Sequence, residues 1–200
     1  TDRVGQQDTS LTHIQHTDAL ASLGRPIPYQ HRVTAASHHQ TPNGAPPGGP
    51  APHVSADKAL NSVAGYTLLN DTSARDLQLG LQMGGDDLLD WFSGKAMQDT
   101  TPVGPYVTVD EIDDPQELHI SSRVDGETMQ DDETSMMVRS VAELVSFVSS
   151  RVRLEPGDVI ATGTPEGVGA FQDIQLHPGE TVEVEIEGIG TLSNTVEEVE

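Results

Sequence analysis

The chain has 200 residues, enough for one domain of ordinary size with a hydrophobic core. Its formal net charge of −22 argues against nucleic acid as a partner, because phosphate binding needs a basic surface, and the same charge would repel an anionic membrane. The sequence contains no cysteine, no apolar run long enough to span a membrane and no signal peptide, which indicates a cytoplasmic protein without disulfides.

Lysine is rare in this acidic chain and occurs only at Lys58 and Lys95. Acid-rich, lysine-poor surfaces are typical of proteins that work in concentrated salt, where repulsion between like charges is screened. We therefore expect a halophilic source, with an acidic protein from ordinary salt as the alternative. The charge is also uneven: residues 1–56 are neutral overall, so that the whole net charge falls on residues 57–200.

Residues 1–53 are expected to form an irregular or disordered segment that is separate from the rest of the chain. They are rich in Thr, Gln, His and Ser, and residues 42–52 are mostly Pro and Gly. Such a Pro/Gly stretch predicts neither a helix nor an inner strand. A short helix over residues 17–23 is the one element expected in this region.

Periodic apolar patterns begin near Ser55 and predict a mostly β domain with a few helices over residues 54–200. An Asp-Gly pair at 125–126 predicts a hairpin turn, and residues 79–92 fit either a loop or a helix. Helices are expected over 56–63 and 140–152, with one helical turn over 73–77. Strands are expected over 64–69, 107–109, 118–124, 159–162, 181–186 and 190–196.

The stretch 65–78, GYTLLNDTSARDLQ, places three charged groups and two amides within nine residues at the end of a predicted strand. Asp71 follows the apolar run directly, so its carboxylate is expected where a rigid strand leaves the core. That is a common position for a ligand of a hard metal ion. Asn-Asp followed by Thr-Ser is also ordinary turn and helix-cap chemistry, and the residues alone leave both interpretations open.

The same stretch resembles the signature of the fumarylacetoacetate hydrolase family, GYT-x-x-ND-x-SARD-x-Q. The resemblance covers roughly residues 54–200 and does not extend to the first 53. It implies a mixed β-roll or sandwich (α+β, mostly β) like the family's C-terminal catalytic domain, incomplete on its N-terminal side. Further motifs follow in the family's order: Gly94-Lys95, PVGP at 102–105, DEI at 110–112, VDGE at 124–127, LEPGDVIATGTPEGVG at 154–169 and VEIEGIG at 184–190.

The resemblance implies a divalent cation, usually Mg²⁺, with Mn²⁺ or Ca²⁺ as alternatives, and Asp71 matches one of its ligands. The family's other carboxylates come from an upstream Glu-x-Glu strand, whereas this chain has no Glu before Glu111. Glu183 and Glu185 match the family's C-terminal strand instead and are interpreted as a solvated acidic face. Because Mg²⁺ prefers several carboxylate oxygens, we expect weak binding.

Three further residues have roles implied by the resemblance. Lys95 matches the active-site lysine, a cation that would stabilise an enolate. Gln78 matches a residue that hydrogen-bonds the substrate. Thr164, with Gly163 before it, matches a loop that binds the carboxylate or oxo group of the substrate. Without the resemblance, Lys95 would be interpreted as a surface lysine and the loop as a turn. Arg75 and Asp76 are expected to form a structural ion pair.

The resemblance therefore implies a metal-dependent hydrolase that cleaves a C–C bond in a 2-oxo or diketo acid of the acylpyruvate or fumarylacetoacetate type, in the catabolism of aromatic compounds and as a homodimer. Isomerisation of 2-hydroxyhepta-2,4-diene-1,7-dioate and decarboxylation of a 2-oxo acid share the enolate and remain alternatives. A truncated or frame-shifted remnant without activity is a third interpretation, motivated by the change in charge near residue 57 and the missing Glu-x-Glu pair. A non-catalytic subunit that pairs with an intact paralogue is a fourth.

Overall fold

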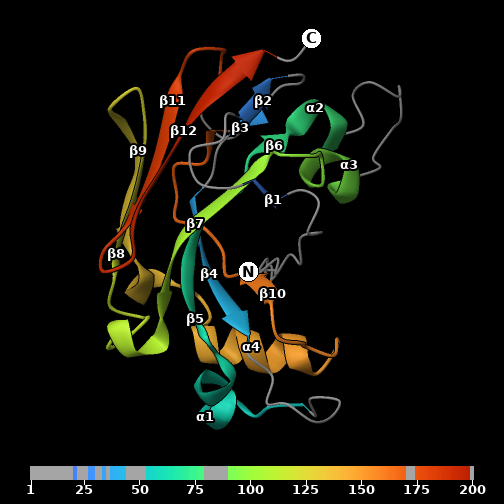
Figure 1. Cartoon of the computed structure of the whole chain (residues 1–200), viewed down its shortest axis with the longest axis vertical. Coiled ribbons are helices and arrows are strands. Elements are labelled where there is room, and N and C mark those ends of the chain that lie inside the picture. The colour runs from blue at the N-terminus through green and yellow to red at the C-terminus, as the bar shows by residue number, and fades with distance from the viewer. Residues whose placement is uncertain are drawn as a thin grey trace, which may run out of the picture.

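Two sheets pack face to face, with short helices at their ends (Figure 1). The computed structural model describes residues 53–78, 90–169 and 174–198, together with the backbone of four short strands at 20–21, 27–29, 33–34 and 37–43. Strands dominate and helices are few, as the sequence predicts. In the described part of the chain, every helix is too short or too polar to cross a bilayer.

The first sheet contains the strand that carries the signature motif. Its order is β1 (Leu20–Ala21), β7 (Thr101–Thr108), β5 (Gly65–Asn70), β4 (Ser37–Asn43) and β10 (Asp158–Ala161). All neighbours are antiparallel except β1 and β7. Every residue of β5 is buried, as a continuous apolar run predicts for a strand covered on both faces.

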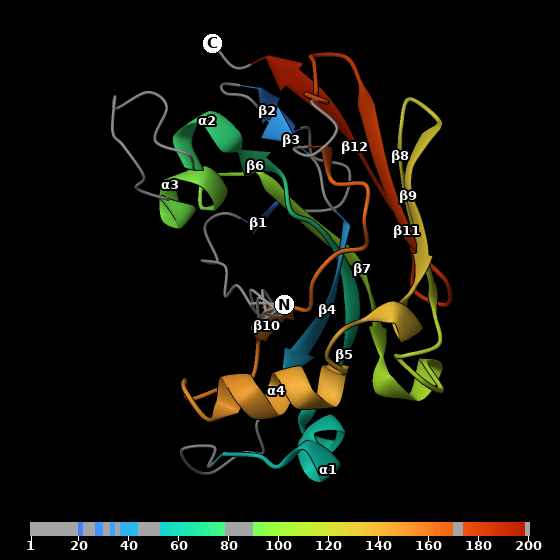
Figure 2. The same ribbon diagram turned by 180° about the vertical axis from the view of Figure 1, so that it is seen from behind.

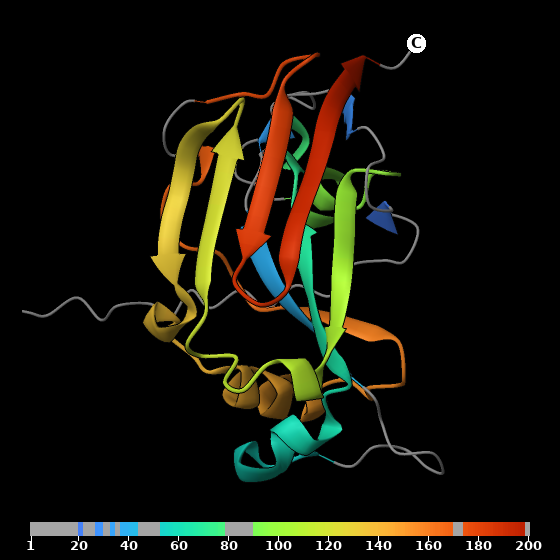
Figure 3. The same cartoon turned by 60° about the vertical axis from the view of Figure 1, so that its left-hand side comes forward.

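The second sheet covers the first (Figure 3). Its order is β2 (Ile27–Tyr29), β12 (Gly190–Glu198), β11 (Thr181–Ile186), β8 (His119–Val124) and β9 (Glu127–Glu133). Alternate residues of β11 are buried, which matches the predicted alternation. The hairpin turn between β8 and β9 is confirmed, because Asp125 and Gly126 both have positive φ, at 49° and 82°. A third pair joins β3 (Val33–Thr34) to β6 (Ser73–Ala74).

The core lies between the sheets and above helix α4 (Val141–Ser149). Leu68 of β5 and Leu192 of β12 are fully buried, and burying one such side chain contributes about 1.5–3 kcal/mol. Helix α4 begins with a capping box between Ser140 and Glu143, as its sequence favours. The predicted helix over 56–63 is shorter, as α1 (Ala56–Ala59) followed by the 3-10 turn η2 (Leu60–Ser62), and it packs on α4.

The structure differs from the expected irregular chain at the four strands before residue 44, and β1 lies where a helix over 17–23 was expected. Strand β4 pairs with β5 through residues 37–40 and with β10 through residues 40–43. Strand β4 pairs with two neighbouring strands through main-chain hydrogen bonds, and these bonds can form a strand even where the side chains show no apolar pattern. The first two residues of the Pro/Gly stretch, Pro42 and Asn43, end β4 and pair with β10 alone, so they do not form the inner part of the strand. At Pro42 the strand has one neighbour, so at most one ladder hydrogen bond is lost.

Candidate active site

Helices α2 (Arg75–Gln78) and α3 (Trp91–Lys95), with β6, lie at the end of the first sheet opposite α1 and α4 (Figures 1 and 2), and Asp71 follows β5 at this end. Strands β5 and β10 are both antiparallel to β4, so Asp71 after β5 and the loop 162–165 after β10 leave the sheet at this end. Strand β7 runs the other way and begins here at Thr101. The two short helices α2 and α3 cover this end.

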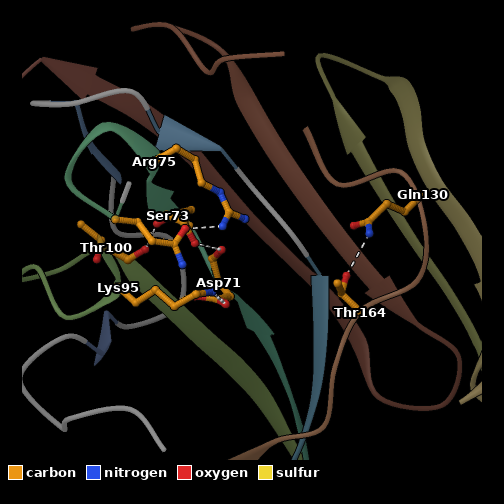
Figure 4. Close-up of polar contacts among 9 residues, drawn as sticks. Asp71, Ser73, Arg75, Lys95, Thr100, Gln130 and Thr164 are labelled. Atoms are coloured by element: carbon orange, nitrogen blue, oxygen red, sulfur yellow. Dashed lines mark hydrogen bonds and ion pairs between the residues drawn. The ribbon is translucent and has the colours of Figure 1, made fainter. Parts of the chain in front are cut away.

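Asp71 and Lys95 form a buried ion pair at the centre of the site. The ammonium Nζ of Lys95 contacts Oδ2 of Asp71, as Figure 4 shows. The two residues are only 2% and 7% exposed. A buried carboxylate is stable as an anion only when an opposite charge compensates it. The structure thus brings together the metal ligand and the lysine that the resemblance implied.

Arg75 and Gln78 extend this polar cluster along α2. The Arg75 guanidinium donates to Oε1 of Gln78; the expected ion pair between Arg75 and Asp76 stays a prediction. Burial lowers the pKa of Arg75, and the nearby carboxylate of Asp71 raises it in part. Gln78 is buried, and its Nε2 has no hydrogen-bond partner among the described residues. The same is true of both amide atoms of Asn70. Buried amides without partners are costly, so these atoms mark a place where a ligand or water would bind.

Two hydroxyl groups hold the turn that follows β5. From the sequence alone, these residues were interpreted only as turn or helix-cap residues. Thr72 donates from Oγ1 to the carbonyl oxygen of Thr100, just before β7. Ser73 donates from Oγ to the carbonyl oxygen of Asp71, at 3.3 Å. Both residues are buried. These bonds fix the backbone directly after Asp71 and tie it to the start of β7, so the position of Asp71 is set by β5 and β7 together.

Helix α3 carries Lys95 at its last position and begins with a charged cap. Oδ1 of Asp90 accepts from the backbone N–H of Ser93 at 2.9 Å, and Oδ2 accepts from the Ser93 hydroxyl at 2.6 Å. These hydrogen bonds lower the pKa of Asp90. The cap orients a helix of only five residues, and with it the lysine.

Thr164 lies apart from the Asp71–Lys95 pair and is held by a residue of the second sheet. Its Oγ1 accepts from Nε2 of Gln130 on β9 at 2.9 Å, and Figure 4 shows both residues across β4 from the Asp71–Lys95 pair. Gly163, before it, has φ of 111° and open space where a side chain would be. Only glycine adopts this φ at little cost. Nothing in the sequence pattern marked Gln130.

The register of the sheet sets the distance between the two parts of the site. Ala161, the last residue of β10, pairs with Gln40 of β4, which pairs with Thr67 of β5. The loop after β10 therefore leaves the sheet two strands away from Asp71, or roughly 10 Å at ordinary strand spacing. A ligand that contacts both Lys95 and Thr164 has to bridge this separation.

The carboxylates of the described residues do not fit a divalent cation. No group of three His, Asp or Glu residues in the described part of the chain is arranged to hold a metal ion. Asp71 offers a single carboxylate, and Lys95 already engages one of its oxygens. A hard cation in a protein prefers several oxygen ligands. The described donor set is therefore incomplete for Mg²⁺.

Two hollows on the described surface lie elsewhere. One, lined in part by Ser122, Met129 and Gly167, borders the inner face of the second sheet. The other lies at the β11–β12 turn, beside His119 and Glu187. Neither includes Asp71 or Lys95. The buried unpartnered amides are a better guide to the site than the shape of the surface, because they identify atoms that need a polar ligand.

Comparison with known proteins identifies the family. The model of the fumarylacetoacetate (FAA) hydrolase C-terminal domain matches residues 3–197. The chain belongs to the fumarylacetoacetate hydrolase family. The match begins at residue 3, well before the start near residue 54 that the sequence motifs suggested.

Relatives of the chain catalyse several reactions. It is 43% identical over 147 residues to the mitochondrial oxaloacetate tautomerase FAHD2A of Bos taurus, covering 72% of this chain and 45% of that protein. The 5-carboxymethyl-2-hydroxymuconate delta-isomerase of Mycobacterium smegmatis has a similar structure, with a TM-score of 0.82, 31% identity and coverage of 100% of this chain and 73% of that one. The fumarylpyruvate hydrolase of Pseudomonas aeruginosa, in complex with Mn²⁺ and pyruvate, has a TM-score of 0.80, 29% identity and coverage of 92% and 77%.

These comparisons confirm the predicted fold class and family. Members similar to the chain are hydrolases, isomerases and tautomerases that act on small organic acids. The chain spans about half the length of the curated relatives it matches.

Proposed function

We propose that the chain acts on a 2-oxo or diketo acid through its enolate, and that the reaction is hydrolysis of a C–C bond in an acylpyruvate-type compound. The buried Asp71–Lys95 pair carries this proposal. A cation held in a low-dielectric site by a fixed carboxylate stabilises negative charge far better than one in water. Nε2 of Gln78, which has no hydrogen-bond partner in the part of the chain that the structure describes, supplies a donor in the same cluster.

Each residue has a distinct role in this proposal. In the hydrolysis, water adds to the carbonyl carbon on the far side of the scissile bond, the C–C bond breaks and its electron pair becomes an enolate whose oxygen lies against Nζ of Lys95. Nζ gives a proton to the released carbon, and the proton lost by the added water restores the ammonium. Gln78 donates to a second substrate oxygen and orients the molecule. Gly163 and Thr164, two strands away, bind the carboxylate or oxo group at the other end. The substrate would thus be an extended acid that bridges β5 and β10.

The resemblance implies Mg²⁺, and a structural neighbour contains Mn²⁺. Because the described carboxylates do not fit a divalent cation, the proposed steps use side chains of the chain alone. Dependence on Mg²⁺, Mn²⁺ or Ca²⁺, and assembly as a homodimer, stay predictions for experiment.

A second candidate is keto–enol tautomerisation or isomerisation of a 2-oxo acid. Hydrolysis needs a group that activates water as well as one that stabilises the enolate. The three histidines whose side chains the structure describes lie away from the site: His53 precedes α1, His119 begins β8 and His177 precedes β11. Tautomerisation needs only a proton donor and a proton acceptor at the enol: the Lys95 ammonium can donate to the carbon, and the neutral amine that results can accept the proton of the enol hydroxyl. The bovine tautomerase named above is a relative with this activity.

The test compares two reactions with a matched pair of variants. The purified chain in concentrated salt with Mg²⁺ is given an acylpyruvate, whose enol absorbance disappears on cleavage, and separately enol-oxaloacetate. We expect Lys95→Met to reduce turnover by about 100-fold or more, as loss of one oxyanion-stabilising donor does. The exposed Lys58 provides the control, and Lys58→Met should have full activity. A folded wild-type chain that converts neither compound would overturn the proposal.

A further inference from the structure

Gln130 uses both the NH₂ and the oxygen of its side-chain amide in hydrogen bonds beside the loop that carries Thr164. Its Nε2 donates to Oγ1 of Thr164 and to the carbonyl oxygen of Pro165, both at 2.9 Å. Its Oε1 accepts from the hydroxyl of Ser122 on β8, also at 2.9 Å. Gln130 is only 3% exposed. One amide thus ties the 162–165 loop to two strands of the second sheet.

The chemistry of these partners fixes the orientation of the amide. A backbone carbonyl can only accept a hydrogen bond, so the group that faces Pro165 must be the NH₂ of Gln130 and not its oxygen. The same NH₂ faces Thr164, which therefore accepts. No described residue accepts the hydroxyl hydrogen of Thr164. That hydrogen is left for an acceptor outside the described residues.

The loop is pressed against β9 at a second point. A Cβ atom at Gly167 would collide with the carbonyl oxygen of Met129, the residue before Gln130. Gly167 also has φ of 97°, which disfavours other residues. The close approach at Gly167 and the two hydrogen bonds from Gln130 hold Thr164 in one place, so its hydroxyl does not swing freely between partners.

We infer that Gln130 is a positioning residue that makes the Thr164 hydroxyl a hydrogen-bond donor, so that this end of the site selects an anionic oxygen. The inference rests on the proposed function, in which Thr164 binds the acid group of the substrate. A hydrogen bond to a charged oxygen is worth more than one to a neutral group. A carboxylate should therefore bind better here than the corresponding neutral amide.

The first measurement tests the hydrogen bonds of Gln130 without any ligand. Both side-chain amide protons of Gln130 should exchange slowly with water in NMR spectra of the whole chain, and Thr164→Val should expose one of them. Exchange as fast as that of an exposed glutamine would overturn the inference.

The second measurement tests selection of charge, with pyruvate and its neutral amide, pyruvamide, as probes. Gln130→Met and Thr164→Val should each weaken pyruvate binding about tenfold to a hundredfold, the range for a hydrogen bond to a charged group. Gln130→Glu turns the partner of Thr164 into an acceptor, so the hydroxyl donates inward and pyruvamide gains on pyruvate. A purely structural role would weaken both probes equally.

Gln116 provides the matched control, because it also joins two segments, through the Thr134 carbonyl and the Val141 N–H, away from this loop. Gln116→Met should leave the preference for pyruvate unchanged. Pyruvate binding that Gln130→Met and Thr164→Val do not alter would overturn the inference and leave the proposed function standing. A wild-type chain with slowly exchanging amide protons that neither binds pyruvate nor turns over substrate would overturn the proposed function, and with it the selection of charge.

Discussion

Gly94 lies so close to Gln78 that a Cβ atom at position 94 would be 2.5 Å from the Cβ of Gln78 and 3.0 Å from its Cα. Real Cβ atoms do not approach each other so closely, so only glycine lets α3 pack directly on α2. Lys95 is the next residue, and its reach to Asp71 depends on this contact. The glycine before the lysine is thus a requirement of helix packing.

Gly94→Ala should therefore push α3 away from α2 and pull Lys95 off the carboxylate. Overpacking of this kind costs about 1–3 kcal/mol, measured as a lower midpoint of urea unfolding, and turnover should fall as well. Gly179→Ala is the control, because nothing lies within 4 Å of its Cβ position and the change reports only the cost of a positive φ. A Gly94→Ala protein with wild-type stability and activity would show that the helices are not in contact.

Lys95→Met should leave Asp71 as a buried charge without its partner and lower the free energy of unfolding by about 3–5 kcal/mol. Asp71→Asn in the same chain should restore much of this loss, because the amide carries no charge. Urea unfolding of both single variants and the double variant gives the coupling energy. Strictly additive effects would mean that the two side chains do not interact in solution.

The cap of α3 predicts a dependence on pH. Hydrogen bonds from Ser93 hold the pKa of Asp90 below its usual value. A carboxyl with a lowered folded-state pKa stabilises the fold above its unfolded-state pKa, and this contribution is lost as the pH falls through the folded-state pKa. Stability and activity should both decline in that acidic range. Asp90→Asn, which can still cap but does not titrate, should lose this component when unfolding is followed from pH 7 downward. An identical pH profile for Asp90→Asn would contradict the assignment.

The net charge of −22 predicts that salt stabilises the chain. The Debye length falls from about 10 Å at 0.1 M salt to about 3 Å at 1 M, so repulsion between surface carboxylates is screened. The thermal unfolding midpoint should rise steadily between these concentrations of KCl. Sucrose at equal osmolality separates screening from a general solute effect. A midpoint that falls with KCl would argue against adaptation to salt.

Mg²⁺ should bind weakly, because the described residues supply one carboxylate that is already paired with Lys95. Titration calorimetry of the whole chain should give a dissociation constant well above the micromolar range. Asp71→Asn should abolish whatever binding is seen if that carboxylate is a ligand. Micromolar affinity in the wild-type chain would show that further ligands exist beyond the described donors.

The sequence predicted the elements with strong apolar patterns. Strand β5 and helix α4 carry a continuous run and a clear stripe, and β11 alternates, so burial alone determines them. Strand β9 was not predicted beyond its hairpin turn. It lies at the edge of the second sheet, where it pairs with one strand and buries few residues. A strand in this position needs few apolar side chains, so its sequence carries no strong pattern.

For the site, the motif located Asp71 and Lys95, and the structure brings them into contact from elements 24 residues apart. The role of Gln130 could not be predicted from the sequence, because β9 is a polar strand in which an exposed glutamine is expected. Gln130 is buried only because the loop that carries Thr164 folds over it. Strand β4 was missed for a different reason. Its pairing uses main-chain groups supplied by β5 and β10, and those strands are distant in the sequence.

Strand β4 lies between the two parts of the site, the Asp71–Lys95 pair and the loop that carries Thr164. Strand β10 pairs with the first sheet only through β4. Proteolytic release of the chain before residue 44 would leave every atom of Lys95 and Thr164 in place within its own segment. It would remove the strand pairing between them, so their separation would depend on the packing of Ile160 in the core and on the hydrogen bonds of Gln130 to the second sheet.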